Sequence, residues 1–151
     1  MNKGETLPDF ILNDQHGQSF SISEVKGKQP VVIYFYPKNF TPGCTKEACS
    51  FRDAYEDFKD LGAEVIGISG DSDASHQKFA KRYSLPFILL ADTKNNVRKM
   101  FGVQGNLLGL LPGRETFVFD TNGLLVFKFE SMGATKHIEK SLKYLRKNSD
   151  G

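Results

Sequence analysis

A chain of 151 residues has the size of one ordinary domain, and it is long enough to bury a core without disulfide bonds or structural metals. With 39% hydrophobic and 25% charged residues, its composition is globular, which excludes a disordered or membrane-spanning chain, and a net charge of +2 does not demand a nucleic-acid-binding face. We therefore expect residues 1–151 to form a single domain that binds neither nucleic acid nor membrane. Since residues 1–10 lack the apolar stretch of a secretory signal, we expect a cytoplasmic location.

A hairpin and a buried strand are the first elements predicted along the chain. Phe10-Ile11-Leu12 and Phe20-Ser21-Ile22 flank the turn-forming segment 14–17, which indicates a small hairpin. Residues 31–36 are β-branched or aromatic without interruption, a pattern typical of a strand buried on both faces. Pro37 ends this strand.

Helices and strands then alternate. The first helix carries one apolar stripe and ends at Gly62; the stripe consists of Ala48, Phe51, Tyr55, Phe58 and Leu61. Residues 64–69 predict a second buried strand, and residues 87–90 a third. Between them, Asp73 is expected to cap a second helix that ends near Tyr83.

The last third of the chain predicts a short helix, a hairpin and a final helix. The short helix covers residues 97–101, and Asn122-Gly123 lies between the apolar runs 116–119 and 124–129 of the hairpin. Residues 136–147 predict an amphipathic helix whose lysines face solvent. The resulting order, βαβαβ followed by ββα, indicates the α/β class, with a central mixed sheet flanked by helices and an N-terminal hairpin. A thioredoxin-like layout fits this order.

Cys44 follows the first buried strand, where the chain turns into the first helix. Thr41 and Pro42 are typical of an N-cap and a first helical residue, so Cys44 falls in the first helical turn. Unpaired N–H groups and the helix dipole favour an anion there, and the thiolate is the reactive form of cysteine. The Thr41 hydroxyl is expected to cap the helix or to face the sulfur. Cys44 is thus a candidate nucleophile, the alternative being a small buried apolar residue.

The spacing of Cys44 and Cys49 has a geometric consequence. In a continuous helix, Cα atoms five residues apart are roughly 8.6 Å apart, from the helical rise and radius. A disulfide needs about 4.4–6.8 Å. The two thiols can therefore be joined only if at least the first helical turn unwinds, which is typical of a catalytic rather than a structural disulfide. The alternative is that Cys49 is a core residue of the helix.

The segment Pro37-x-x-x-Thr41-x-x-Cys44 resembles the active-site signature of the peroxiredoxins. Several segments within this signature and beyond it resemble the peroxiredoxin Q branch of that family, also called bacterioferritin comigratory protein. These segments are residues 34–37, 41–45, 47–49, 51–53, 65–69, 89–92 and 111–117.

This resemblance implies a thioredoxin-like fold and a thiol-dependent peroxidase, an oxidoreductase that reduces hydrogen peroxide and organic hydroperoxides. It implies that Cys44 is the peroxidatic cysteine, oxidised to a sulfenic acid, and that Cys49 resolves it as an intramolecular disulfide. Thr41 and Arg114 match the other active-site positions, and Pro37 matches the proline that shields the thiolate from water. The resemblance also implies a monomer that thioredoxin or a similar dithiol protein recycles.

Two other functions stay open on the residues alone. A dithiol oxidoreductase acting on protein disulfides would also use two nearby cysteines, although its usual C-x-x-C motif is absent. A binding module on a thioredoxin-like scaffold would leave both cysteines inert. Because His16, His76 and His137 are far from the cysteines in sequence, a zinc site has little support, and we expect no metal or other cofactor.

Overall fold

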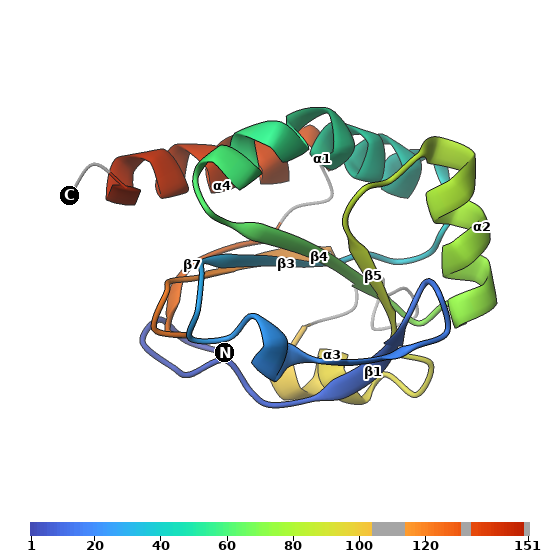
Figure 1. The fold of residues 1–151 in the computed structure, drawn as a ribbon, viewed down its shortest axis with the longest axis horizontal. Helices are drawn as coiled ribbons and strands as arrows, with labels where there is room; N and C mark the ends of the chain where they lie inside the picture. Colours follow the sequence, from blue (N-terminus) through green and yellow to red (C-terminus); the bar gives the residue numbers. More distant parts are fainter. Residues whose placement is uncertain (104–113, 131–133, 150–151) are drawn as a thin grey trace.

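The computed structural model describes residues 1–103, 114–130 and 134–149 (Figure 1). Its elements follow the predicted order. They are β1 (Ile11–Asp14), β2 (Ser19–Ser21), the 3₁₀ helix η1 (Ile22–Glu24), β3 (Val31–Phe35), α1 (Pro42–Asp60), β4 (Glu64–Ser69), α2 (Asp73–Tyr83), β5 (Ile88–Ala91), α3 (Asn96–Phe101), β6 (Glu115–Phe119), β7 (Leu125–Glu130) and α4 (Ala134–Ser149).

In the described ranges, seven strands form one mixed sheet in the order β2-β1-β5-β4-β3-β6-β7. The central strands β3, β4 and β5 are parallel, joined by the crossover helices α1 and α2. The hairpin β6–β7 adds antiparallel to β3, and the hairpin β1–β2 adds antiparallel to β5. The predicted α/β class, with a mixed sheet, flanking helices and an N-terminal hairpin, is confirmed.

Strand β3 separates two apolar layers, because successive side chains of a strand point to opposite faces. Val32 and Tyr34 pack into the layer that α1, α2 and α4 cover. Val31, Ile33 and Phe35 pack into the layer beneath α3 and the N-terminal segment. Figure 1 shows α1 and α4 side by side over one face of the sheet and α3 on the other. This burial on both faces explains the uninterrupted apolar run of β3.

Gly67 of β4 provides space for the ring of Tyr34. A Cβ atom at this glycine would lie 2.7 Å from Cζ of Tyr34 and 2.9 Å from Cδ2 of Leu89, which is closer than carbon atoms pack. The Tyr34 ring stacks on Phe51 of α1, with ring centroids 4.5 Å apart. The absence of a side chain at Gly67 therefore allows α1 to sit close to the sheet.

Most element boundaries differ by one or two residues from the sequence prediction. Ser72, not Asp73, is the N-cap of α2: its backbone is extended, and its hydroxyl accepts a hydrogen bond from the Ser75 N–H at 3.1 Å. Asp73 is the first helical residue; the helix dipole favours its carboxylate, and its Oδ1 accepts a hydrogen bond from the Ala74 N–H at 2.8 Å. Strand β3 stops at Phe35, and β5 begins at Ile88. None of the helices in the described part of the chain is long and apolar enough to cross a membrane.

Candidate active site

The candidate site lies where β3 leaves the sheet and α1 begins. The Tyr36 N–H donates to the Ile68 carbonyl at 3.2 Å, and the half-buried Pro37, which has no N–H, ends the pairing. Residues 37–41 then lead into α1, with Thr41 at the N-cap and Pro42 as the first helical residue, as predicted. The site is thus at the carboxyl end of a central strand, where α/β sheets usually bind ligands.

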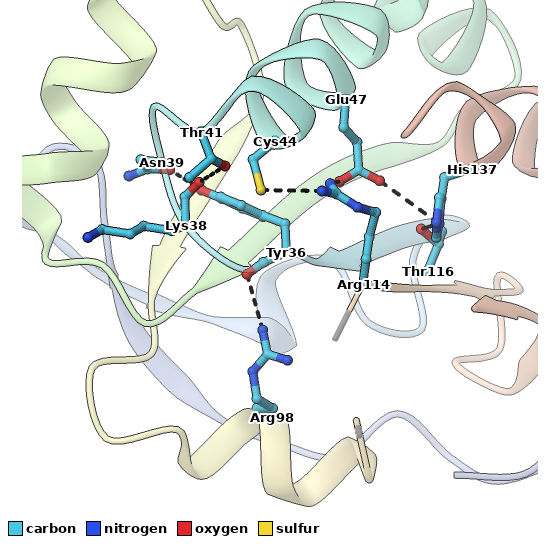
Figure 2. A network of polar contacts seen from close by, with 10 residues as sticks. All are labelled: Tyr36, Lys38, Asn39, Thr41, Cys44, Glu47, Arg98, Arg114, Thr116 and His137. Carbon is cyan, nitrogen blue, oxygen red and sulfur yellow. Dashed lines mark hydrogen bonds and ion pairs between the residues drawn. The ribbon is translucent and has the colours of Figure 1, made fainter. Parts of the chain in front are cut away.

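Cys44 is held in the first turn of α1 and is only 1% exposed. The helix ladder begins with the Thr45 N–H, which donates to the Thr41 carbonyl at 2.8 Å. The N–H groups of Gly43 and Cys44 precede this bond and therefore contribute to the anion-favouring end of the helix. The sulfur accepts a hydrogen bond from Nη2 of Arg114 at 3.5 Å (Figure 2).

Thr41 occupies the predicted position, but its side chain does not cap the helix. Its hydroxyl donates to the Lys38 carbonyl at 2.8 Å (Figure 2). The expected side-chain cap is therefore wrong, because this nearer carbonyl takes the hydroxyl proton. The Oγ1 lone pairs stay available to accept a hydrogen bond.

Arg114 reaches Cys44 because of the sheet register. It directly precedes β6, and β6 pairs Glu115 with Phe35 at the end of β3. Arg114 therefore emerges next to the point where the chain turns toward α1. Its side chain is 3% exposed, and a Cβ atom at Gly43 would lie 3.0 Å from Nη2, so the glycine leaves room for the guanidinium. Residues 104–113, which precede Arg114, lie outside the described residues.

Glu47 is a site residue that the sequence prediction missed. It lies one turn after Cys44 on the same helix face, is 0% exposed, and its Oε1 accepts from Nη1 of Arg114 at 2.5 Å. Burial raises the pKa of the Glu47 carboxyl to about 8, against the lowering effect of Arg114. Its position in the sequence gave a signal, because a charged residue three positions after a first-turn cysteine shares its face.

His137 of α4 completes this buried network. Its Nδ1 lies 2.7 Å from Oγ1 of Thr116 and 3.9 Å from Oε2 of Glu47 (Figure 2). Oε2 itself has no hydrogen-bond partner among the described residues. On the opposite face of α4, Lys136, Lys140 and Lys143 are exposed, as the periodicity predicted. The buried histidine among these lysines was missed, since nothing local distinguishes it from a surface residue.

A second buried polar network, the Asn39 network, joins the loop before Cys44 to α2. Tyr36 donates its hydroxyl proton to Oδ1 of Asn39 at 2.6 Å (Figure 2). The amide Nδ2 of Asn39 lies 2.9 Å from Nδ1 of His76 and 3.2 Å from Oγ of Ser75. The Asn39 N–H donates to Oδ2 of Asp71 at 2.9 Å. Each polar group of the Asn39 side chain thus has a partner.

Both cysteines are free thiols, and α1 is continuous from Pro42 to Asp60. This arrangement agrees with the expected helical form of the reduced segment. Cys49 is partly exposed on α1, one turn before Arg52. Arg52 donates from Nη1 to the Tyr83 carbonyl at 2.7 Å, which ties the helix to the end of α2 beyond the second cysteine.

The site is suited to nucleophilic chemistry at sulfur. Burial tends to lower the pKa of Arg114, but its interactions with Glu47 and Cys44, including a hydrogen bond to each, outweigh this effect and raise that pKa above its ordinary value, so the guanidinium stays charged. It faces the sulfur together with the N-terminus of α1. Within the ranges the structure describes, no three His, Cys, Asp or Glu side chains are grouped so that they could hold a metal ion.

Comparison with known proteins gives concordant matches. Residues 3–128 match the AhpC/TSA family. The chain is 56% identical over 147 residues to the chloroplastic peroxiredoxin Q of Sedum lineare, covering 97% of this chain and 78% of that protein. It superposes on peroxidoxin BcpB of Mycobacterium tuberculosis with a TM-score of 0.89 and 40% identity over 97% of each chain. With the bacterioferritin comigratory protein of Xanthomonas campestris, described for its alkyl peroxide reduction activity, the TM-score is 0.85 and the identity 29%, over 93% and 92% of the chains.

The expected cytoplasmic location is contradicted by these comparisons. The relatives from Sedum lineare, Populus jackii and Arabidopsis thaliana are all chloroplastic proteins. The expectation rested on the character of the first ten residues, which by themselves carry no information on location.

Proposed function

Because this chain belongs to the AhpC/TSA family and is a thiol-dependent peroxidase of the peroxiredoxin Q branch, we propose that Cys44 attacks the peroxide and that Cys49 resolves the product. The observation that carries this assignment is the 3.5 Å hydrogen bond from Arg114 to the Cys44 sulfur at the start of α1. The guanidinium and the N-terminus of α1 both direct positive charge at this sulfur, an environment typical of a reactive cysteine.

In the first step, the Cys44 thiolate attacks the terminal oxygen of R–O–O–H and the O–O bond breaks. The sulfur gains that oxygen as a sulfenic acid, S–O–H, and the leaving alkoxide takes a proton to become R–OH. Arg114 and the N–H groups at the start of α1 lie where negative charge develops on the oxygens, so they stabilise the transition state. The Thr41 hydroxyl donates to the Lys38 carbonyl, so a lone pair of its Oγ1 accepts a hydrogen bond from the peroxide O–H.

For Pro37, the proposed role is to exclude water from the thiolate. Pro37 is half-buried at the start of the segment 37–41, and its backbone has no N–H that could donate a hydrogen bond to water. A drier site strengthens the attraction between Arg114 and the developing charge.

In the second step, the first turn of α1 unwinds and the Cys49 thiol condenses with the sulfenic acid. An S–S bond forms and water leaves. A dithiol protein, thioredoxin or one like it, then attacks this disulfide by thiol exchange, returns both cysteines to thiols and is itself oxidised. Cys49 is only partly buried, which supports the proposal that its thiol can move to Cys44 of the same chain when the helix turn unwinds.

We further propose that residues 1–151 act as one domain and as a monomer, without cofactor, on hydrogen peroxide and organic hydroperoxides. The alkyl peroxide activity described for the Xanthomonas campestris relative supports the second substrate class. Sedimentation of the reduced protein tests the monomer: a single species near 16.9 kDa is expected, and a stable dimer would contradict it.

Intact mass with thiol trapping tests the two cysteine roles. The reduced protein is treated with one equivalent of hydrogen peroxide and quenched within seconds by an alkylating agent. The parent should lose two hydrogens and both alkylation sites, whereas Cys49→Ser should gain one oxygen at Cys44. If both proteins stay reduced and alkylate fully, Cys44 is not the peroxidatic residue.

A further inference from the structure

We propose that Asn39 and His76 are positioning residues of the peroxide step, which fix the loop in front of Cys44 to helix α2. The proposal rests on the assignment of Cys44 as the residue that attacks peroxide. Neither side chain has a hydrogen bond to Cys44 or Arg114 among the described contacts. They act through the backbone of residues 37–41.

Asn39 forms hydrogen bonds to three segments of the fold. Its side chain binds Tyr36 at the end of β3 and both Ser75 and His76 in α2, and its N–H binds Asp71 after β4. It is 3% exposed, so these bonds form away from water. A buried amide that loses its partners is strongly unfavourable, and the loop therefore cannot shift without breaking several bonds together.

A hydrogen bond at Nε2 fixes the tautomer of His76. Nε2 lies 3.0 Å from the carbonyl of Leu90 in β5, to which only an N–H can donate. Nδ1 is then the acceptor for the Asn39 amide. Burial lowers the pKa of His76, against the raising effect of Asp71 and Asp73, and this keeps the neutral ring that the geometry requires.

The loop needs such an anchor because the next residue is strained. Phe40 has φ of +66°, in the left-handed region that side chains other than glycine rarely adopt. Its ring packs against Phe79 and Tyr83 of α2, with centroids 5.1 and 6.4 Å apart. Strained conformations persist where the surroundings fix them on both sides. Asn39 on one side and the Phe40 ring on the other keep the backbone that delivers Thr41 to the N-cap.

The first test measures the peroxide step alone, as the second-order rate constant of sulfenic acid formation in the Cys49→Ser background. Asn39→Ala should lower it by about tenfold to a hundredfold, because small displacements of reacting groups have effects of that size. The matched control is Ser72→Ala, which removes the N-cap of the same helix but does not touch the loop. It should keep the parent rate constant.

Equal rate constants for Asn39→Ala and Ser72→Ala in folded protein would overturn the proposal. Absence of sulfenic acid in the Cys49→Ser parent would instead overturn the assignment of Cys44, so the two failures are distinguishable. Circular dichroism confirms that each variant is folded before its rate is measured.

The second test makes the hydrogen bond between residue 39 and His76 depend on protonation of His76. In Asn39→Asp, the new carboxylate still accepts a hydrogen bond from Tyr36. It can form a hydrogen bond with His76 only if Nδ1 of His76 carries a proton. The negative charge of the nearby Asp71 also favours protonation of His76. The ratio of the variant's peroxide rate constant to the parent's should then rise several-fold as pH falls from 8 to 6. Adding His76→Asn, which keeps an acceptor or donor near the Nδ1 position but cannot titrate, should abolish the rise. A ratio that does not change with pH in Asn39→Asp would contradict the role of His76.

Discussion

At the scale of single residues, Arg114 joins the two halves of the site because its terminal nitrogens have different partners. Nη1 binds Glu47 and Nη2 binds the Cys44 sulfur. Lysine offers one nitrogen and cannot reproduce this forked contact. Arg114→Lys should therefore lower the rate constant of sulfenic acid formation by about a hundredfold, the usual effect of losing one preorganised donor.

The control for this change is Arg146→Lys on α4, where the exposed guanidinium lies 3.9 Å from Asp57. Exposed ion pairs have small effects, so this variant should match the parent. Rapid-mixing kinetics with hydrogen peroxide measures both. A loss of less than threefold in Arg114→Lys would remove Arg114 from the proposed mechanism.

The Glu47 carboxyl predicts a pH dependence. Its pKa is raised to about 8 by burial, so near neutral pH it holds its proton and leaves the charge of Arg114 to the sulfur. Above pH 8 the carboxylate forms and competes for Arg114. The rate constant of the parent, divided by that of Glu47→Gln, should be constant below pH 7 and fall several-fold by pH 9. A ratio that rises with pH would instead show that an ionised Glu47 is required.

The raised pKa of Glu47 also predicts how the folding stability changes with pH. Because the pKa of Glu47 is raised in the folded state, its linked stability is complete below the ordinary carboxyl pKa and is lost as pH rises through about 8. Glu47→Gln, which cannot ionise, should gain stability relative to the parent over that range. Urea unfolding at pH 5 and pH 9 measures the difference.

The site could be predicted from the sequence only where chemistry is local. Thr41, Pro42 and Cys44 follow from helix-start rules, and the distance argument for Cys49 follows from helix geometry. Arg114 is 70 residues from Cys44, and only a family resemblance singled it out. The spacing of Glu47 places it on the helix face of Cys44, but its burial and its proximity to His137 depend on a pairing between α1 and α4, which periodicity does not reveal.

At the scale of elements, α1 contains a segment that must change and a segment that need not. Cys44 and Cys49 both lie in the continuous helix, whereas Arg52 ties the next turn to the Tyr83 carbonyl. In the oxidised protein, amide hydrogens of residues 45–49 should lose protection against exchange, and those from Arg52 to Asp60 should keep it. Hydrogen exchange followed by mass spectrometry compares the two forms.

Peroxide-treated Cys49→Ser supplies the control for this experiment, because it reaches the sulfenic acid without forming the disulfide. Its exchange pattern should stay close to that of the reduced parent. Full protection of residues 45–49 in the disulfide form would be incompatible with the helix geometry from which the unwinding was inferred.

The order of elements was predictable because strands buried on both faces give long apolar runs, as in β3 and β4. The boundaries of the helices and strands were less predictable from the sequence. Ser72 and Asp73 are both good capping residues, and the choice depends on which one has extended backbone, a property that tertiary packing sets. The pairing of β1 with β5, which adds the N-terminal hairpin to the sheet, has no local signal at all.

At the scale of the whole molecule, the layer between α1 and the sheet is closely packed around Gly67. Gly67→Ala would place a methyl group against the Tyr34 ring and Leu89, so it should destabilise the fold by about 1–3 kcal/mol, as overpacking does. Thermal or urea unfolding measures this loss. Unchanged stability would mean that α1 can move away from the sheet without penalty.

A second substitution tests the same contact from the other side. The Tyr34 hydroxyl is buried without a hydrogen-bond partner among the described residues, and it lies 2.8 Å from the position of the new methyl group. Tyr34→Phe should therefore be neutral or stabilising alone and should recover part of the stability lost in Gly67→Ala. Strict additivity of the two changes would show that the hydroxyl takes no part in the clash.

The first turn of α1 belongs to the packed core, since Cys44 and Ala48 share an apolar layer with Val32 and Tyr34. In the proposed cycle, part of this layer must open at every turnover before the disulfide can close. The stability of one helical turn then sets the lifetime of the sulfenic acid, during which a second peroxide can oxidise it irreversibly to sulfinic acid. A substitution that made this turn more stable would give a protein that resists heat better and survives oxidant worse.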